Sequence, residues 1–176
     1  MEKGVLLITQ GNFEKAFLDR IAFEIKKELH MQVLFQEGFF EIADFYDPVR
    51  RQYDANRILQ FIDNNSTVGS DIKKMGLFRI DLFIPVLTYI FGQAVLNGQS
   101  GIASLYRLRN EQYGMKKDDE ILINRFVKVI IHELGHMHGL VHCHNAACVM
   151  RSSTYVEDLD QKKSMFCASC KDMLKH

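Results

Sequence analysis

The stretch from residue 132 to residue 142 reads His132-Glu133-Leu134-Gly135-His136-Met137-His138-Gly139-Leu140-Val141-His142. Histidines are crowded here, because five of the seven in the chain lie between His132 and His144. At residue frequencies of roughly 5%, the pattern H-E-x-x-H-x-x-G-x-x-H matches by chance about once in several million windows. Folding alone does not require such crowding, so the pattern indicates a chemical function.

The spacing of this motif predicts a metal site. Residues four apart on an α-helix lie on nearly the same face, so His132 and His136 can reach one metal ion. Gly139 allows the backbone to leave the helix with a positive φ, and His142 can then return to the same ion. Glu133 is rotated by about 100° from His132 and therefore faces the water on the metal. Three histidines with an open fourth position are typical of catalytic zinc.

Such a site can carry out hydrolysis. Zinc lowers the pKa of a water molecule, and Glu133 takes the proton as the water attacks a peptide carbonyl. Glu133 then passes the proton to the departing amine. The remaining histidines are assigned to the surface or the core: His30, His138, His144 and His176. His138 follows His136 by two residues, which places it on the other side of the helix, away from the metal.

The cysteines predict a second metal site. They are Cys143, Cys148, Cys167 and Cys170. Two pairs at this spacing can surround one tetrahedral zinc with every position filled, which makes the site structural. Two disulfides are the alternative in a secreted protein, but the N-terminus carries no secretory signal. A redox role is disfavoured, because nothing around Cys167 resembles a strand-to-helix thioredoxin setting. Since Cys143 follows His142 directly, a structural zinc would hold the loop that carries the third catalytic ligand.

The composition predicts one globular domain. The chain has 176 residues, of which 47% are hydrophobic, enough for a real core. Basic and acidic residues both number 22, so no net positive charge is present to bind a nucleic-acid backbone. The apolar stretch over 82–96 is too short and too interrupted to span a bilayer. We therefore expect a cytoplasmic monomer that binds neither nucleic acid nor membrane.

Hydrophobic periodicity predicts the order of the elements. They are a strand over 4–9, a helix over 13–29 capped by Asn12, a strand over 31–35, a connecting segment over 39–48, a helix over 53–64, strand-like runs over 77–85, 88–96 and 102–108, and a long helix ending at the C-cap glycine Gly139. Beyond Gly139 few large apolar residues occur before the second cysteine pair. Metal binding is therefore expected to supply folding free energy to this tail.

The histidine motif with a downstream methionine resembles the metzincin clan of zinc peptidases. The longer pattern H-E-L-G-H-x-x-G-L-x-H-C, then Cys148-Val149-Met150 and Phe166-Cys167-Ala168-Ser169-Cys170, is similar to the archaemetzincins, peptidase family M54. Three upstream segments also resemble that family: Asp81-Leu82-Phe83-Ile84-Pro85, Phe91-Gly92-Gln93-Ala94 and Ser104-Leu105-Tyr106-Arg107-Leu108.

The resemblance implies a fold of the α/β (α+β) class. It consists of a twisted mixed β-sheet with packed helices, an active-site helix, and a small zinc-stapled C-terminal subdomain. In this chain the single domain would divide into residues 1–138 and residues 139–176. Met150 would be the methionine of the Met-turn, a hydrophobic floor beneath the metal rather than a ligand.

The resemblance also implies how a substrate binds. In this clan an extended peptide lies antiparallel to an edge strand, for which the segments 92–96 and 102–105 are the candidates. Ser152 stands where some clan members have a tyrosine ligand, so that ligand is not expected. Tyr155 lies nearby and is assigned to surface packing.

We interpret the chain as a zinc metallopeptidase that acts on peptides or small proteins and holds two zinc ions, one catalytic and one structural. Glu133 favours catalysis, because metal binding alone does not need a carboxylate beside His132. Two alternatives stay open: a non-catalytic zinc-binding module with the same scaffold, and a zinc hydrolase of a non-peptide amide. A zinc-finger nucleic-acid module is disfavoured by the zero net charge and the lack of a basic recognition helix.

Overall fold

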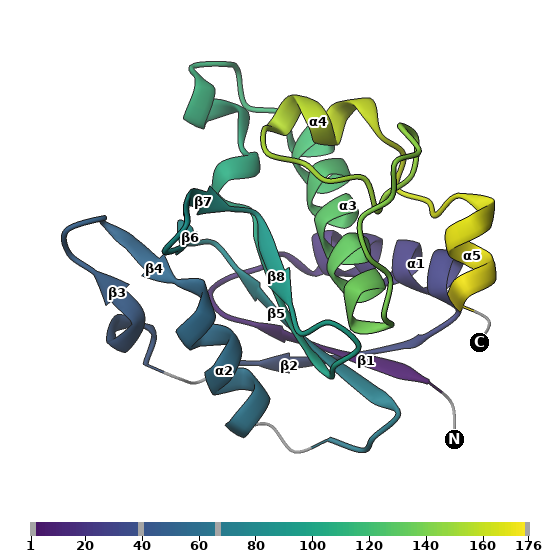
Figure 1. Ribbon diagram of the computed structural model, residues 1–176. Coiled ribbons are helices and arrows are strands. Elements are labelled where there is room, and N and C mark those ends of the chain that lie inside the picture. Colours follow the sequence, from purple (N-terminus) through teal and green to yellow (C-terminus); the bar gives the residue numbers. More distant parts are fainter. Residues whose placement is uncertain (1–2, 39–40, 66–67, 175–176) are drawn as a thin grey trace.

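The computed structural model describes residues 3–38, 41–65 and 68–174. In these residues two mixed sheets pack with five α-helices (Figure 1), which confirms the predicted mixed α/β class. Within the described ranges, every helix is too short or too polar to cross a membrane.

The larger sheet has the strand order β2-β1-β5-β9-β8. Its strands are β1 (Gly4–Thr9), β2 (Gln32–Glu37), β5 (Ile72–Phe78), β8 (Gly92–Ala94) and β9 (Ser100–Ser104). Neighbouring strands are parallel except β8, which runs antiparallel to β9 and forms one edge of the sheet. Side chains alternate between the faces of a strand. Accordingly, Val5 and Leu7 face one core while Ile8 belongs to the other.

Helices cover both faces of this sheet (Figure 1). They are α1 (Lys15–Leu29), α2 (Ala55–Asn65) and α3 (Asp119–Met137). Side chains of α1 and α3, such as Ile25 and Ile130, share the first core with Leu7. On the other face Ile58 and Ile62 of α2 share the second core with Ile8. The helix that carries the histidine motif therefore packs beside α1 on one face of the sheet.

A second, smaller sheet adjoins the larger one where β7 leads into β8. Its order is β3-β4-β6-β7. The strands are β3 (Tyr46–Asp47), β4 (Gln52–Asp54), β6 (Leu82–Ile84) and β7 (Leu87–Ile90), and the 3-10 helix η1 (Ile42–Phe45) precedes them. β6 and β7 form an antiparallel hairpin. Since only Phe91 separates β7 from β8, the two sheets provide one continuous strand beside α3 (Figure 1).

Local signals explain where α3 begins and ends. The 3-10 helices η2 (Tyr106–Leu108) and η3 (Asn110–Tyr113) lead up to it. The Asp118 side chain accepts a hydrogen bond from the Ile121 N–H and caps the first turn. At the other end α3 stops at Met137, His138 is the C-cap, and Gly139 follows it with φ of 89°, so the predicted glycine ends the helix one position beyond the cap. The helices α4 (Val156–Gln161) and α5 (Ala168–Leu174) follow.

The tail contributes more to the core than expected. Its buried apolar residues are Leu140, Cys148, Val149, Met150, Val156, Leu159, Phe166 and Cys170. They belong to the same cluster as the buried side chains of α1 and α3. The expectation of a tail short of core-forming residues is therefore wrong, because these side chains are buried together with those of α1 and α3, although others such as Val141 and Tyr155 are exposed. The division at residue 138 stays a prediction.

Two helix starts differ from the expectations. α1 begins after Glu14, which makes no side-chain cap hydrogen bond, so Asn12 is not its N-cap. α2 begins at Ala55 rather than near residue 53, because Tyr53 and Asp54 pair with β6. The Asp54 carboxylate instead accepts the Arg57 N–H at the start of the helix. Part of the predicted connecting segment, residues 39–40, lies outside the described ranges.

Two strand-like runs are divided between the sheets. The run over 77–85 belongs to β5 as far as Phe78 and to β6 from Leu82 onward. The run over 88–96 is likewise shared by β7 and β8. Periodicity detects extended backbone but not the partner of each strand, so it could not show that neighbouring residues enter different sheets.

Candidate metal centres and the adjoining cleft

Three histidines of the motif converge. His132 and His136 come from one face of α3, and His142 comes from the loop after Gly139. One ring nitrogen of each histidine, the candidate ligand atom, lies within 4.8 Å of the other two, and the Nε2 atoms of His132 and His136 are 3.0 Å apart. With zinc–nitrogen bonds of about 2.0–2.1 Å, ligand atoms around a tetrahedral zinc are roughly 3.4 Å apart. The three imidazoles thus have a spacing that fits one zinc ion.

Backbone carbonyls orient two of the rings. The Nδ1 atom of His132 is 2.8 Å from the Val149 oxygen, and that of His136 is 2.7 Å from the Leu140 oxygen. A carbonyl only accepts, so we assign the proton to Nδ1 and a lone pair to each Nε2. Burial lowers the pKa of His132 to about 3, and the positive charge of Lys162 acts in the same direction. Both effects favour the neutral imidazole, which is the form that binds a metal.

Glu133 lies beside the histidines on the wall of the same cleft. It is 7% exposed. Burial raises the pKa of its carboxyl group to about 8, and the Lys162 ammonium opposes that shift. The side chain packs on β8, where a Cβ atom at Gly92 would lie 2.9 Å from Glu133 Cγ and 2.8 Å from the Ile102 oxygen. The absence of a side chain at Gly92 therefore provides the space that the Glu133 side chain occupies.

Lys162 is a member of the site that sequence reasoning missed. It lines the cleft although it is only 4% exposed. Its Nζ donates to the Val149 oxygen at 2.8 Å and to the Arg151 oxygen at 2.7 Å, so one carbonyl serves both Lys162 and His132. Burial lowers the pKa of Lys162 to about 8, while Glu133 acts to raise it. A lone lysine in a polar segment carries no sequence signal for such a position.

Met150 lies fully buried against α3. A Cβ atom at Gly135 would collide with the Met150 sulfur and lie 3.0 Å from Phe166 Cε1. The glycine between the two histidines of the helix thus lets this methionine approach closely. The contact supports Met150 as a hydrophobic floor, and its role as the Met-turn residue stays a prediction.

The four cysteines form a second cluster. Their sulfur atoms lie within 4.8 Å of one another, and the pairs Cys143–Cys167 and Cys148–Cys170 are both 3.8 Å apart. Four thiolates around zinc at about 2.3 Å are roughly 3.8 Å from each other, whereas disulfide sulfurs are about 2.05 Å apart. All four thiols are free of disulfides. The donor set and its spacing therefore fit a closed tetrahedral zinc site.

The other histidines lie apart from these clusters, as far as the structure describes them. His138 Nδ1 is 2.8 Å from the Leu134 oxygen, one helical turn back, and is not in the three-histidine group, as expected. His30 follows α1 in a left-handed conformation, and His144 is exposed. His176 lies outside the described residues.

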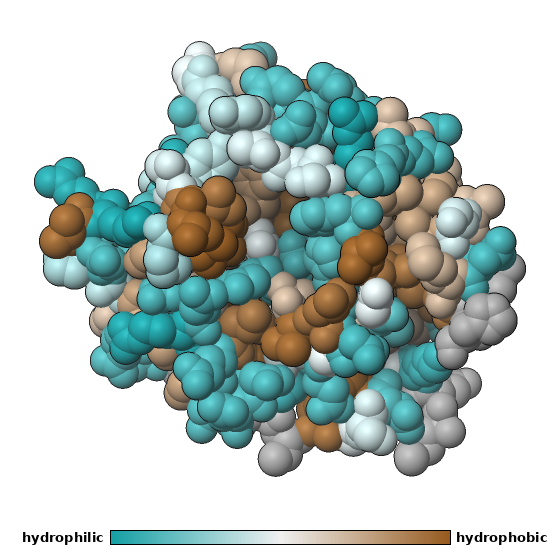
Figure 2. Space-filling view, viewed as in Figure 1, coloured by the Kyte–Doolittle hydropathy of each residue, from teal (hydrophilic) through white to brown (hydrophobic). Residues whose placement is uncertain are grey.

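A cleft of about 640 Å³ adjoins the histidines and Glu133. Strands β7 and β8 line one side of it, and Val141, His142 and residues 152–155 line the other. Figure 2 shows this face of the molecule as hollowed, with apolar side chains around the hollow. Tyr155, which is expected to pack on the surface, lines the cleft with 62% of its surface exposed.

Two polar atoms in the lining have no partner in the described structure. They are Gln93 Oε1 on β8 and Ser153 Oγ on the opposite side. A buried polar atom without a hydrogen bond costs about 1–3 kcal/mol and is uncommon. Ser153 Oγ is therefore a candidate for contact with a ligand, whereas the Gln93 side chain lies on the α2 side of β8, where its Nε2 donates to Asn56 Oδ1 at 2.7 Å.

Comparisons with known proteins agree with this site. The profile of peptidase family M54 matches residues 19–176. An archaemetzincin from Saccharolobus islandicus is 34% identical over 170 residues, which cover 96% of this chain and 91% of that protein. The crystal structure of a zinc-dependent peptidase from Methanocorpusculum labreanum superposes with a TM-score of 0.86 at 30% identity, over 97% of this chain and 100% of that one. An archaemetzincin structure from Methanopyrus kandleri has a TM-score of 0.84 at 29% identity, over 98% and 94% of the two chains.

Proposed function

The chain belongs to peptidase family M54, the archaemetzincins, and on that premise we propose that it hydrolyses peptide bonds as a zinc metallopeptidase, with Glu133 as general base and general acid. The likeness to the zinc-dependent peptidase from M. labreanum extends over the whole of that chain, which supports the same class of activity. The residue roles below are argued from the site itself.

We assign a catalytic zinc ion to His132, His136 and His142. Two of these rings are held through Nδ1 by carbonyls and present Nε2 to the common centre, which supports the assignment. A structural zinc ion is assigned to the sulfur cluster of Cys143, Cys148, Cys167 and Cys170. Bound at the histidines, zinc supplies a Lewis acid that polarises a carbonyl and lowers the pKa of water.

Glu133 transfers the proton. Its carboxylate is held between α3 and β8 at Gly92 and faces the cleft. The ionised group accepts a proton from the attacking water and donates it to the departing amine. The ammonium of Lys162 favours the ionised form of Glu133 against the effect of burial.

Strand β8 is the edge along which an extended peptide would lie. Strand β9 lies between β5 and β8, which removes the segment 102–105 from the candidates. Since the Ser104 N–H donates to Phe91 and the Val95 N–H to Ser100, the backbone groups of Gly92 and Ala94 point away from β9. They are therefore placed to pair with a substrate backbone, and Ser153, which has an unpartnered Oγ, lines the same cleft.

One observation carries the proposal. The imidazoles of His132, His136 and His142, at a spacing that suits one metal ion, lie in the same cleft as the buried Glu133, beside the unpaired edge of β8. A zinc site that served only for binding would not need Glu133 in this position. The same geometry suits attack on a carbonyl in the cleft.

The test is to incubate zinc-loaded protein with a diverse peptide library and to identify the products by mass spectrometry. Glu133→Ala, checked for unchanged zinc content, is the matched control. Cuts that vanish in the variant support the proposal, whereas the same cuts in both proteins contradict the role of Glu133. If neither protein cuts any peptide, a non-catalytic zinc module is favoured, or a hydrolase of non-peptide amides, which a panel of small amides would reveal.

A further inference from the structure

We propose that Tyr89 closes one end of the cleft and so limits the size of the substrate side chain that follows the cleaved bond, and that the Arg107–Asp81 ion pair positions Tyr89 for this task. The inference rests on the proposed peptidase function and concerns which peptides fit the site. It makes Tyr89 a specificity-determining residue and Arg107 a positioning residue.

The two ends of the cleft differ in character. At one end Leu96 and Val141 are 56% and 61% exposed. At the other end three of the lining side chains are apolar and buried: Phe91, Val129 and Leu159. Val129 precedes Glu133 by four residues, so it lies on the same face of α3, about 6 Å along the helix. The apolar end is therefore about one helical turn away from the carboxylate.

Tyr89 spans this apolar end. It belongs to β7 on one side of the cleft, and its hydroxyl donates to the Thr154 oxygen on the other side at 3.2 Å. Its ring centroid lies 5.7 Å from that of Phe91. The side chain thus joins the two sides of the cleft beside the apolar lining, so a large side chain entering there must displace it.

Arg107 packs against the Tyr89 ring. Its guanidinium carbon lies 4.9 Å from the ring centroid, within the range of a cation–π contact. The Nε and Nη2 atoms donate to the two carboxylate oxygens of Asp81, at 2.8 and 2.5 Å. Two parallel hydrogen bonds fix the plane of a guanidinium group. Asp81 therefore determines how Arg107 lies against the tyrosine.

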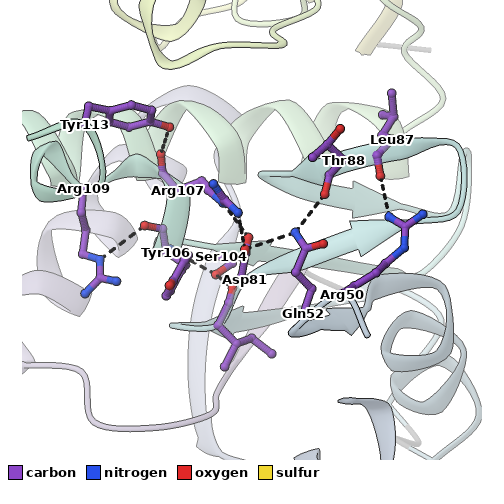
Figure 3. Close-up of polar contacts among 11 residues, drawn as sticks. Arg50, Gln52, Asp81, Leu87, Thr88, Ser104, Tyr106, Arg107, Arg109 and Tyr113 are labelled. Atoms are coloured by element: carbon purple, nitrogen blue, oxygen red, sulfur yellow. Dashed lines mark hydrogen bonds and ion pairs between the residues drawn. The ribbon is translucent and has the colours of Figure 1, made fainter. Parts of the chain in front are cut away.

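Asp81 also holds the strand that carries Tyr89. The amide nitrogen of Gln52 donates to Asp81 at 3.1 Å and to the Thr88 oxygen at 2.9 Å (Figure 3). Gln52 and Asp81 are 6% and 8% exposed, so this network is shielded from water. The Asp81 carboxylate thus supports the Tyr89 ring through Arg107 and the backbone at Thr88 through Gln52. A tyrosine at the edge of a cleft would not need these contacts merely to remain soluble.

The direction of β8 decides which substrate residue meets Tyr89. The strand runs from Gly92 to Ala94, away from the end that Tyr89 closes. A peptide antiparallel to it runs toward that end, so the residue on the carboxyl side of the cleaved bond faces Val129 and Tyr89. We expect this position to accept side chains the size of valine or leucine and to reject phenylalanine and tryptophan.

The experiment compares wild type with Tyr89→Ala and Tyr89→Phe in the zinc-loaded form, using the peptide library. Tyr46→Phe is the control, because Tyr46 packs on Tyr53 outside the cleft. Tyr89→Ala should raise kcat/KM for peptides with an aromatic residue after the cut by about tenfold relative to leucine peptides. Tyr89→Phe keeps the ring but loses the hydrogen bond to Thr154, and it should give a smaller change in the same direction.

A second readout does not depend on turnover. The same proteins are titrated with peptide hydroxamates whose side chains grow from methyl to indolylmethyl. Tyr89→Ala should shift the preferred side chain to a larger one. If peptides are not cleaved but this shift occurs, the peptidase proposal fails and the role of Tyr89 stands. If peptides are cleaved and neither readout changes in Tyr89→Ala, Tyr89 does not limit side-chain size. If no hydroxamate binds and no peptide is cleaved, both proposals are overturned.

Arg107→Met tests the positioning role. It should shift the preference in the same direction as Tyr89→Phe, with little change in kcat for leucine peptides. A merely structural role would instead lower the melting temperature and reduce kcat for all peptides alike. A lower melting temperature and a lower kcat for all peptides, with an unchanged preference for the side chain after the cut, would overturn the role assigned to Arg107.

Discussion

The two candidate metal centres are neighbours in the chain but differ in what surrounds them. The histidine centre opens on a cleft, with Glu133 and the ammonium of Lys162 beside it. The sulfur cluster has four thiols at tetrahedral spacing, and two of them, Cys148 and Cys170, are buried. An open site can bind a reactant, whereas a site whose ligands fill every position can only hold its own chain together.

The loop from Cys143 to Val149 connects the two candidate centres. Cys143 follows His142, and the Cys143 N–H donates to the Met150 oxygen. At the other end of the loop, Cys148 precedes Val149, whose carbonyl oxygen orients His132. The cysteine cluster therefore supports both His142, a proposed ligand of the histidine centre, and the carbonyl that orients His132, another proposed ligand. We therefore expect substitution of a cysteine to disturb the histidine centre. Substitution at the histidine centre should leave the cysteine cluster intact.

The largest effect is expected from Cys167→Ser, which removes one ligand of the closed site. The tail should lose order, His142 should lose its support, and both zinc ions should be held more weakly. We expect a melting temperature lower by about 10 °C, with loss of activity. Zinc content and thermal unfolding measure this, with Ser169→Ala as the control in the same turn. Two bound zinc ions and full activity in Cys167→Ser would contradict the coupling.

Glu133→Ala should have the opposite signature, because it leaves all metal ligands in place. We expect kcat to fall by about 10³-fold, within the range for loss of a general base. Zinc content and melting temperature should stay close to wild type. A variant that lost zinc in parallel with activity would show that Glu133 supports the metal site rather than proton transfer.

Gly92→Ala should disturb the open site through the room around Glu133. The new Cβ would meet the Ile102 oxygen at 2.8 Å and Glu133 Cγ at 2.9 Å. We expect a loss of about 1–3 kcal/mol in stability, as for other overpacked positions, together with a displaced carboxylate and a lower kcat. Gly69→Ala is the control, since no atom lies within 4 Å of a Cβ placed there. If both variants behaved alike, close packing at Gly92 would not matter for catalysis.

Lys162→Met should give the smallest effect and sharpen the contrast between the centres. Without the ammonium, the backbone at Val149 and Arg151 loses the donor that holds it in place, so the carbonyl that orients His132 is positioned less firmly. Groups that orient a metal ligand typically affect metal affinity by about 10–100-fold. Competition with a chelator should therefore release the histidine-bound zinc about tenfold faster, with the cysteine-bound zinc unchanged. Lys163→Met is the control, because Lys163 is the exposed neighbour of Lys162. Equal rates of zinc release from the two variants would argue against the role of Lys162.

The grouping of the candidate ligands was predictable because their geometry is local. A spacing of four residues brings His132 and His136 together on any helix, and Gly139 adopts the positive φ that turns the chain back toward His142. The strand over 4–9 was likewise predicted with its observed ends, since a short apolar run can be buried on both faces. In each case neighbouring residues alone contain the signal.

Other parts of the site could not be predicted, because they join distant segments. Lys162 reaches the Val149 carbonyl from thirteen positions away, and Tyr89 reaches Thr154 across sixty-five. Gly92 meets Glu133 only after β8 has joined the edge of the sheet. Single glycines, lysines and tyrosines are too common for any of these contacts to leave a pattern.

The amino-acid sequence by itself determined which residues could act as ligands and as the proton acceptor, since spacing and residue chemistry are properties of the chain. Only the tertiary structure decided what surrounds them. It placed β8 at the open edge, buried Glu133 and Lys162 in the same cleft, and set Tyr89 across one end. The physical reason is that burial and electrostatic surroundings depend on every element packed around a group, and those elements come from all parts of the chain.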